Sequence, residues 1–300
     1  MLSKIDALTS QYRKLIIQPN GGLAIGNDQQ NNVMISQNFK AEELIGDFNI
    51  FCQLPPFLIR TCIFPGDNTI IMDRVLPFFD LWAVKTIHYF SHHPKFMVQN
   101  KGAQNFDFDS NLELFESLLL LGLESERYDI LRRDTPLGKV ISESSEKLLP
   151  CFVYPLLESV VRNGCNGILN PDGTIANITA FSALPAKKKK FYEEHLRQNP
   201  KFQVSNIGDE LLLLTKASKN PFRATIDATI KEFAICVNSP KEAYATIMDA
   251  RNGILHGDKI SSRGAIAVKY IIFLLCLSKI SEEEYKKEFH RLQHYQMSFW

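Results

Sequence analysis

The sequence predicts an α+β protein, with a β-rich or mixed N-terminal domain followed by a C-terminal bundle of helices. In the first hundred residues, turn-forming segments rich in Pro, Gly, Asn and Asp separate short β-branched and aromatic runs. From about Leu112 onward the pattern is that of successive helices. The length of 300 residues is enough for two domains, and a hydrophobic content of 45% can fill their cores.

The N-terminal domain is expected to span residues 1–105. Strands joined by tight turns are predicted for the β-rich runs NVMIS, FNIFCQL, LIRTCIF and TIIMD. One helix is predicted for RVLPFFDLWAVKTIHYF, and Pro77 indicates a late start because proline is disfavoured inside helices. The polar segment NKGAQNFDFDSN marks the end of this domain.

The helical domain is expected to span residues 106–300, with the core of its bundle at about 136–297. Its first long segment, PLGKVISESSEKLLPCFVYPLLESVVRNG, contains Pro150 and Pro155 as predicted kinks or breaks and ends at Gly164. A loop rich in turn residues follows. Further helices are predicted at about 186–198, 208–218, 222–237, 240–256, 263–279 and 282–297.

Cysteine usage and the polar N-terminus favour a cytoplasmic protein. The six cysteines form no CxxC pair and lie mostly in apolar runs, which is typical of buried thiols in a reducing compartment. The first residues, MLSKIDALTSQYRKL, are too polar for a secretory signal. The most apolar stretch, GAIAVKYIIFLLCLSKI, contains Lys269 and is predicted to be a buried helix, so no membrane contact is expected.

The helix predicted at 240–256 has a well-defined start. Ser239 is the expected N-cap, Pro240 occupies the first turn, and Glu242 completes a capping box three residues after the cap. Apolar residues at three- and four-residue spacing then give this helix one buried face. Polar residues near its C-terminal end are therefore expected to lie beside or opposite that face.

The stretch DARNGILHGDK places Arg251, Asn252 and His256 at the end of this helix. An arginine can grip a phosphate, and a histidine can transfer a proton near neutral pH. RNA supplies its own nucleophile, the 2′-hydroxyl, so the three residues suit phosphodiester cleavage without a metal. An ideal helix places Arg251 and His256 about 140° apart, so a loosened helix end or a second chain would have to bring them together. The alternative is an ordinary helix C-terminus, where Arg and His complement the dipole.

These residues resemble the signature of the HEPN superfamily of helical-bundle proteins. That signature is an arginine, a polar residue and then a histidine, before the last bundle helices; here it is RNGILHG, followed by AIAVKYIIFLLCL. The resemblance implies a metal-independent endoribonuclease without a cofactor. In it, Arg251 binds the scissile phosphate, His256 transfers a proton, and Asn252 orients one of them. The products carry a 2′,3′-cyclic phosphate and a 5′-hydroxyl.

The resemblance also implies partners. Family members pair so that two motifs line one cleft, which predicts a homodimer formed through the helical domain and acting on RNA. A role in bacterial defence or in a toxin–antitoxin pair follows, with an antitoxin or trigger molecule that the sequence does not identify and an N-terminal domain that senses it or selects the target. The alternative is a non-catalytic HEPN-like module that dimerises and binds RNA or protein.

A second candidate RNA contact lies in PAKKKKFYEEH. After residue 135 the chain carries 22 Lys and Arg against 17 Asp and Glu, which favours a polyanionic partner for this half. Lysines beside aromatic residues can bind an RNA backbone and stack its bases, although such runs are also common on solvated helix faces. The candidate RNA-binding residues are Lys187, Lys188, Lys189, Lys190 and Tyr192.

Two further groups of residues are candidates for a site. Glu158 and Arg162 lie one helical turn apart, and they either face the site or form an ion pair on their own helix. His88, His92 and His93 lie close together, but no cysteine or carboxylate stands nearby at ligand spacing, so no metal site is predicted.

Overall fold

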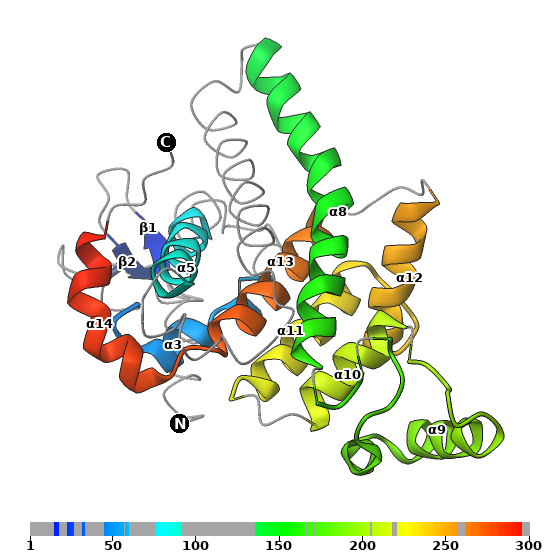
Figure 1. Cartoon of the computed structure of the whole chain (residues 1–300). Helices are drawn as coiled ribbons and strands as arrows, with labels where there is room; N and C mark the ends of the chain where they lie inside the picture. The colour runs from blue at the N-terminus through cyan, green and yellow to red at the C-terminus, as the bar shows by residue number, and fades with distance from the viewer. Residues whose placement is uncertain are drawn as a thin grey trace.

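The computed structural model describes residues 15–17, 23–26, 32–33, 45–56, 58–59, 76–91, 136–165, 167–170, 172–204, 206–217, 221–256 and 262–295. Helices dominate this part of the chain, as Figure 1 shows. The α-helices are α3 (Phe48–Gln53), α5 (Leu76–Ser91), α8 (Pro136–Gly164), α9 (Ala186–Gln198), α10 (Ile207–Ala217), α11 (Arg223–Cys236), α12 (Ala243–Leu255), α13 (Ser262–Leu277) and α14 (Glu282–His294). A 3₁₀ helix, η2, spans Ile178–Ala183.

The prediction of a β-rich N-terminal domain is wrong, because the described residues belong to a helical protein. The run FNIFCQL, predicted as a strand, forms α3. Its buried residues Phe48, Phe51 and Cys52 follow the three- and four-residue spacing of a helix. Aromatic and β-branched composition suggested a strand, but the periodicity of burial is helical. Leu58 and Ile59, which open the run LIRTCIF, are helical too, whereas TIIMD lies outside the described residues.

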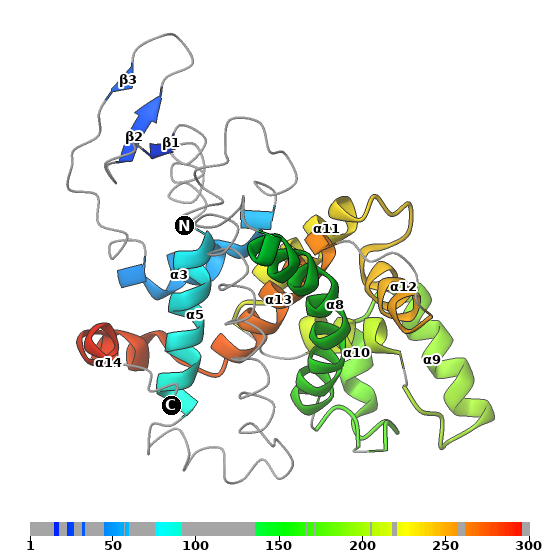
Figure 2. The same ribbon diagram turned by 90° about the horizontal axis from the view of Figure 1, so that it is seen from above.

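Among the residues that the structure describes, short strands form one small antiparallel meander, seen apart from the helices in Figure 2. It comprises β1 (Leu15–Ile17), β2 (Leu23–Gly26) and β3 (Asn32–Val33), in the order β1-β2-β3. Ile25 of β2 pairs with Leu15 on one side and with Val33 on the other. Strands of two to four residues add an appendage to the helical fold and do not change its class.

The helices predicted from periodicity are largely confirmed. Helix α5 occupies the predicted segment, and Pro77 lies in its first turn, where a missing N–H removes no helical hydrogen bond. Helix α8 runs without a break through Pro150 and Pro155, so neither proline ends the helix. Pro155 and Cys151, the residue four positions before it, are both exposed, so solvent reaches the helix backbone at this proline.

Helix α13 forms the centre of the molecule. It packs against α8, α11 and α5, which surround it in Figures 1 and 2. Side chains on all its faces are buried, among them Val268, Ile271, Phe273 and Leu274. No single helix in the described part is long and apolar enough to cross a membrane, although α13 and α14, bent by 104°, reach that length and composition as a pair.

Helices from both ends of the chain share this core. Lys269 of α13 forms a buried ion pair with Asp80 of α5. The indole Nε1 of Trp82 donates a 2.8 Å hydrogen bond to the Tyr285 hydroxyl of α14. That hydroxyl donates in turn to the carbonyl oxygen of Ile45, at 2.6 Å. The predicted boundary after residue 105 lies outside the described residues, but the buried residues before and after it form one cluster.

Candidate active site

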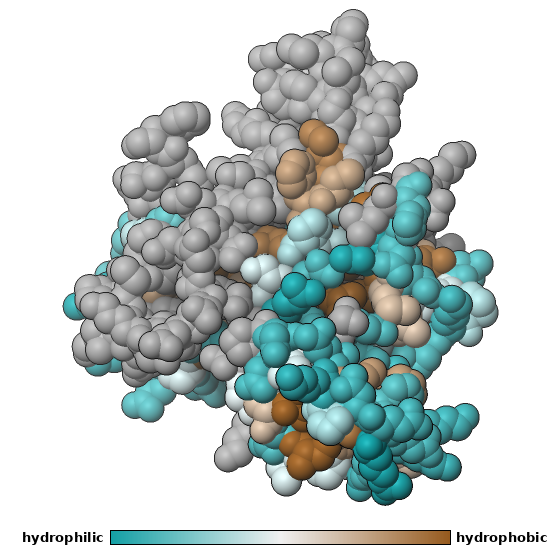
Figure 3. Space-filling model, turned by 45° about the vertical axis from the view of Figure 1, so that its right-hand side comes forward, coloured by the Kyte–Doolittle hydropathy of each residue, from teal (hydrophilic) through white to brown (hydrophobic). Residues whose placement is uncertain are grey.

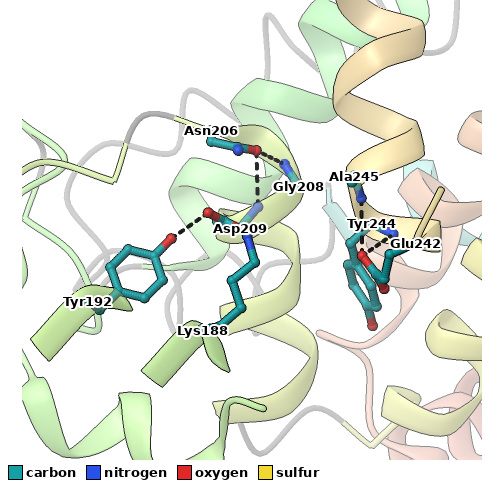
Figure 4. Close-up of polar contacts among 8 residues, drawn as sticks. All are labelled: Lys188, Tyr192, Asn206, Gly208, Asp209, Glu242, Tyr244 and Ala245. Atoms are coloured by element: carbon teal, nitrogen blue, oxygen red, sulfur yellow. Dashed lines mark hydrogen bonds and ion pairs between the residues drawn. The ribbon is translucent and has the colours of Figure 1, made fainter. Parts of the chain in front are cut away.

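Helix α12 begins later than predicted and with a different cap. Its first residue is Ala243, and the Glu242 side chain is the N-cap. As Figure 4 shows, Glu242 Oε2 accepts hydrogen bonds from the backbone N–H groups of Tyr244 and Ala245, at 3.1 and 3.2 Å. The predicted N-cap, Ser239, precedes the helix and leaves this role to Glu242. A glutamate in this place satisfies the first N–H groups and complements the helix dipole.

A carboxylate on α11 fixes the first turn of α12. The Tyr244 hydroxyl donates a 2.9 Å hydrogen bond to Asp227 Oδ1. Two lysines also bind this carboxylate, Lys216 at 2.7 Å and Lys231 at 2.8 Å. Burial alone would raise the pKa of Asp227, but the hydrogen bonds from these three side chains lower it to about 2. The N-terminal end of α12 is thus tied to α10 and α11 by a charged network.

Helix α10 approaches α12 closely at a glycine. Asn206 Oδ1 caps α10 by accepting from the N–H groups of Gly208 and Asp209, at 2.8 and 3.3 Å. Figure 4 shows this turn beside the start of α12. A Cβ on Gly208 would lie 2.5 Å from the backbone oxygen of Tyr244, so only glycine fits. This contact helps to determine where the rest of α12 lies.

Near the other end of α12, Arg251 has two partners. Its Nη1 donates to the Asn252 side-chain oxygen at 3.1 Å. Its Nη2 lies 2.8 Å from Oε1 of Glu158, which projects from α8. The side chains of Arg251 and Glu158 are 31% and 23% exposed, so solvent reaches this ion pair. Two of the three predicted site residues therefore touch, and a residue from another helix joins them.

His256 is the C-cap of α12, directly after the last helical residue. Its backbone has φ −93° and ψ 4°, and its N–H still donates to the carbonyl of Asn252 at 3.1 Å. The residue is exposed. Gly257, the predicted helix stop, lies outside the described residues. An exposed imidazole at a helix end is accessible to a ligand, which a histidine buried among apolar neighbours would not be.

A second ion pair, which the sequence did not predict, lies next to the first. Arg162 Nε is 3.7 Å from Oε1 of Glu210 on α10. Glu210 is only 3% exposed. Its pKa is raised above the usual value, because burial and the charge of Glu158 raise it by more than the nearby Arg162 lowers it. Glu158 and Arg162 each bind a residue on another helix. Their one-turn spacing indicated a shared face, but no local pattern pointed to Glu210.

Tyr192, a predicted base-stacking residue, is buried. Its hydroxyl donates a 2.6 Å hydrogen bond to Asp209 Oδ2, and its ring packs edge-on against Phe181 at 4.9 Å. Lys188 binds the other oxygen of the same carboxylate at 2.5 Å, as Figure 4 shows. These two side chains join α9 to α10, so the ring of Tyr192 presents no open face to a base.

The other three lysines of the run, Lys187, Lys189 and Lys190, are exposed. Lys189 and Lys190 each pair with a glutamate one turn further along α9, at 3.9 and 3.7 Å. Figure 3 brings the side that carries α9 and α12 forward, and hydrophilic residues cover most of its described surface. This part of the run is a solvated helix face with partly neutralised charge.

The histidines considered for a metal are only partly described. His88 Nδ1 lies 2.7 Å from the Tyr295 hydroxyl, within hydrogen-bonding distance. His92 and His93 lie outside the described residues. Where the structure places side chains, no group of three or more His, Cys, Asp or Glu residues could hold a metal ion.

The C-terminal end of α12 carries one group that can bind an anion and another that can transfer a proton, and the described contacts join Arg251 to Asn252 but not to His256. A partly exposed guanidinium oriented by Asn252 can hold a phosphate, and an exposed imidazole at the same helix end can give or take a proton. No family model, curated protein or solved structure matches this chain. The chemistry of the site therefore has to be inferred from its own residues.

Proposed function

We propose that this chain is a metal-independent endoribonuclease of the HEPN type, which cleaves RNA by attack of the RNA 2′-hydroxyl on the adjacent phosphate. One observation carries the proposal. Arg251, Asn252 and His256 all lie at the accessible end of α12, and Asn252 orients the guanidinium through a 3.1 Å hydrogen bond. Cleavage of this kind needs a cation for the phosphate and a group that moves a proton, and both are present.

Each residue has a distinct role in this proposal. Arg251 binds the scissile phosphate and offsets the negative charge that grows on it in the transition state. His256 removes the proton from the 2′-hydroxyl or donates one to the leaving 5′-oxygen. Asn252 orients Arg251 through its side-chain oxygen. The products carry a 2′,3′-cyclic phosphate and a 5′-hydroxyl, because the 2′-oxygen replaces the 5′-oxygen on phosphorus.

A second copy of the chain completes the site in this proposal. On an ideal helix, Arg251 and His256 point about 140° apart, so one chain directs them to different sides of α12. A homodimer would let the arginine of one protomer act with the histidine of its partner. Such an enzyme fits a role in bacterial defence or in a toxin–antitoxin pair, and sedimentation of the purified protein measures the dimer directly.

The first prediction is that His256→Ala strongly reduces the rate of RNA cleavage. Purified wild-type protein and the variant are incubated with end-labelled single-stranded RNA in EDTA, and the product ends are identified. Loss of a proton-transfer group reduces the rate by a factor of about 10² to 10⁴. His290→Ala is the matched control, because it removes an exposed imidazole from α14, on the opposite side of the molecule from α12 in Figure 1.

The second candidate function is a non-catalytic module that dimerises and binds RNA or protein. The observation in its favour is that both terminal nitrogens of Arg251 already have protein partners, as in a purely structural arginine. Equal inactivity of wild type and His256→Ala on several RNAs, with binding retained in both, would favour this function. Cleavage by wild type and His290→Ala but not by His256→Ala would exclude it.

A further inference from the structure

The partner of Arg251 on α8 has a role beyond packing. We infer that the Glu158 carboxylate occupies the anion site of Arg251, so that an RNA phosphate has to displace it before the site can act. This inference rests on the proposed function, since it describes the regulation of the same site. It makes Glu158 a built-in competitor of the substrate.

The contact itself is of a kind that a phosphate can replace. The closest approach of Glu158 to the guanidinium joins Oε1 to Nη2, at 2.8 Å. A phosphate can take two parallel hydrogen bonds from the same planar guanidinium, so it can replace the carboxylate there. Both side chains are partly exposed, at 31% and 23%, and such an ion pair is weakened by water and salt.

The two described ion pairs at the site together carry no net charge. Two arginines, Arg162 and Arg251, face two glutamates, Glu158 and Glu210. A site that binds an RNA backbone normally presents an excess of positive charge. Displacing Glu158 from Arg251 would supply that excess where the scissile phosphate is expected to bind.

Contacts other than this ion pair also hold α12 in place. The helix start is held by the Glu242 cap and by the hydrogen bond from Tyr244 to Asp227. The close approach at Gly208 sets its distance from α10. Glu158 can therefore exchange with a ligand while the fold around it stays in place.

The second prediction is that Glu158→Gln increases the affinity for RNA. Glutamine keeps the shape and an acceptor oxygen but removes the charge that competes with phosphate. We expect a Kd for single-stranded RNA about three- to fivefold lower at low salt, the factor that corresponds to a partly exposed ion pair. Binding is measured by fluorescence anisotropy in the His256→Ala background, so that cleavage does not interfere, and the gain should shrink as salt increases.

Glu283→Gln is the matched control for this experiment. It removes the same unit of charge from an exposed position on α14, which Figure 1 places on the opposite side of the molecule from α12. A gain of equal size in the control would show that net charge alone is responsible and would overturn the inference. Weaker RNA binding by Glu158→Gln would also overturn it, since Glu158 would then position Arg251 for the substrate.

A chemical readout separates this inference from the proposed function. Phenylglyoxal reacts with accessible guanidinium groups, and peptide mapping measures the extent of reaction at each arginine. Glu158→Gln should raise the modification rate of Arg251 several-fold and leave that of the exposed Arg223 unchanged. If Arg251 becomes more reactive in Glu158→Gln, but neither this variant nor the wild type binds or cleaves RNA, then Glu158 covers an anion site and the ribonuclease proposal fails. Unchanged reactivity at Arg251 would refute the role of Glu158.

Discussion

At the scale of single residues, Gly208 shows how one missing side chain positions the helix that carries the candidate site. Its backbone lies so close to α12 that a Cβ would meet the carbonyl oxygen of Tyr244 at 2.5 Å. The obstacle is backbone, so rotation of a flexible side chain cannot relieve it. The distance between α10 and α12 therefore depends on this glycine, and through α12 so does the placement of Arg251.

The third prediction is that Gly208→Ala destabilises the protein. Overpacking against a backbone oxygen is expected to lower the free energy of unfolding by about 1–3 kcal/mol, which urea denaturation measures. Gly46→Ala is the control, since a Cβ there would meet only the ring of Phe289, at 3.9 Å. Equal stability of Gly208→Ala and Gly46→Ala would show that α10 can move away from α12 without loss.

At the scale of elements, the start of α12 is held by a charged network on its neighbours. Asp227 of α11 accepts from Lys216, Lys231 and Tyr244. The hydrogen bonds that these residues donate outweigh the effect of burial and lower the pKa of Asp227 to about 2. Since an unfolded aspartate has a pKa of about 3.9, the folded state favours the charged form.

The fourth prediction follows from the sign of this shift. Because the pKa of Asp227 is lower in the folded state, its charge stabilises the fold at any pH above the unfolded pKa. This stabilisation is lost as the pH falls from about 4 to about 2. Asp227→Asn should therefore reduce the free energy of unfolding by about 2 kcal/mol at neutral pH and by much less near pH 2.

Urea denaturation of wild type and variant at both pH values provides the measurement. Asp249→Asn is the control, because its carboxylate is 39% exposed and pairs with the single lysine Lys241 at 2.6 Å. Such a surface pair contributes little, so the control should lose less than about 1 kcal/mol. A loss for Asp227→Asn that stays the same at both pH values would contradict the role assigned to its charge.

At the scale of the whole molecule, the N-terminal helices are part of the same core as the bundle. Helices α3 and α5 pack against α13 and α14 through buried residues. Asp80 supplies the charge that Lys269 needs in the interior, and Trp82 binds the buried hydroxyl of Tyr285. Removing one partner of a buried ion pair leaves an uncompensated charge, which is strongly destabilising.

The fifth prediction is that a fragment of residues 136–300 does not fold on its own. Without α3 and α5 it would expose apolar faces of α13 and α14 and leave Lys269 buried without Asp80. We expect the fragment to lack a cooperative thermal transition, whereas the full chain shows one by circular dichroism. A cooperative transition in the fragment would instead support an independent helical domain.

Much of the helical fold can be predicted from local patterns. The helix predicted at 186–198 has the bounds of α9, and the segments assigned to α5 and α8 are helical as expected. The prediction is wrong at α3, where aromatic and β-branched composition indicates a strand but Phe48, Phe51 and Cys52 have helical spacing. It is also wrong at the N-cap of α12, where Ser239 is predicted and Glu242 is observed. The side chain that caps the helix is the one whose oxygen reaches the first free N–H groups, and this depends on where the helix begins.

The sequence by itself determined which side chains lie at the end of α12 and most helix positions, because residue identity and helix periodicity are local properties. It placed Arg251, Asn252 and His256 on one helix end and Glu158 one turn from Arg162. Only the tertiary structure decided that Glu158 binds Arg251, that Arg162 binds Glu210 and that Tyr192 is buried. The physical reason is that these contacts depend on which helices lie side by side, and that follows from burial of the whole core around α13.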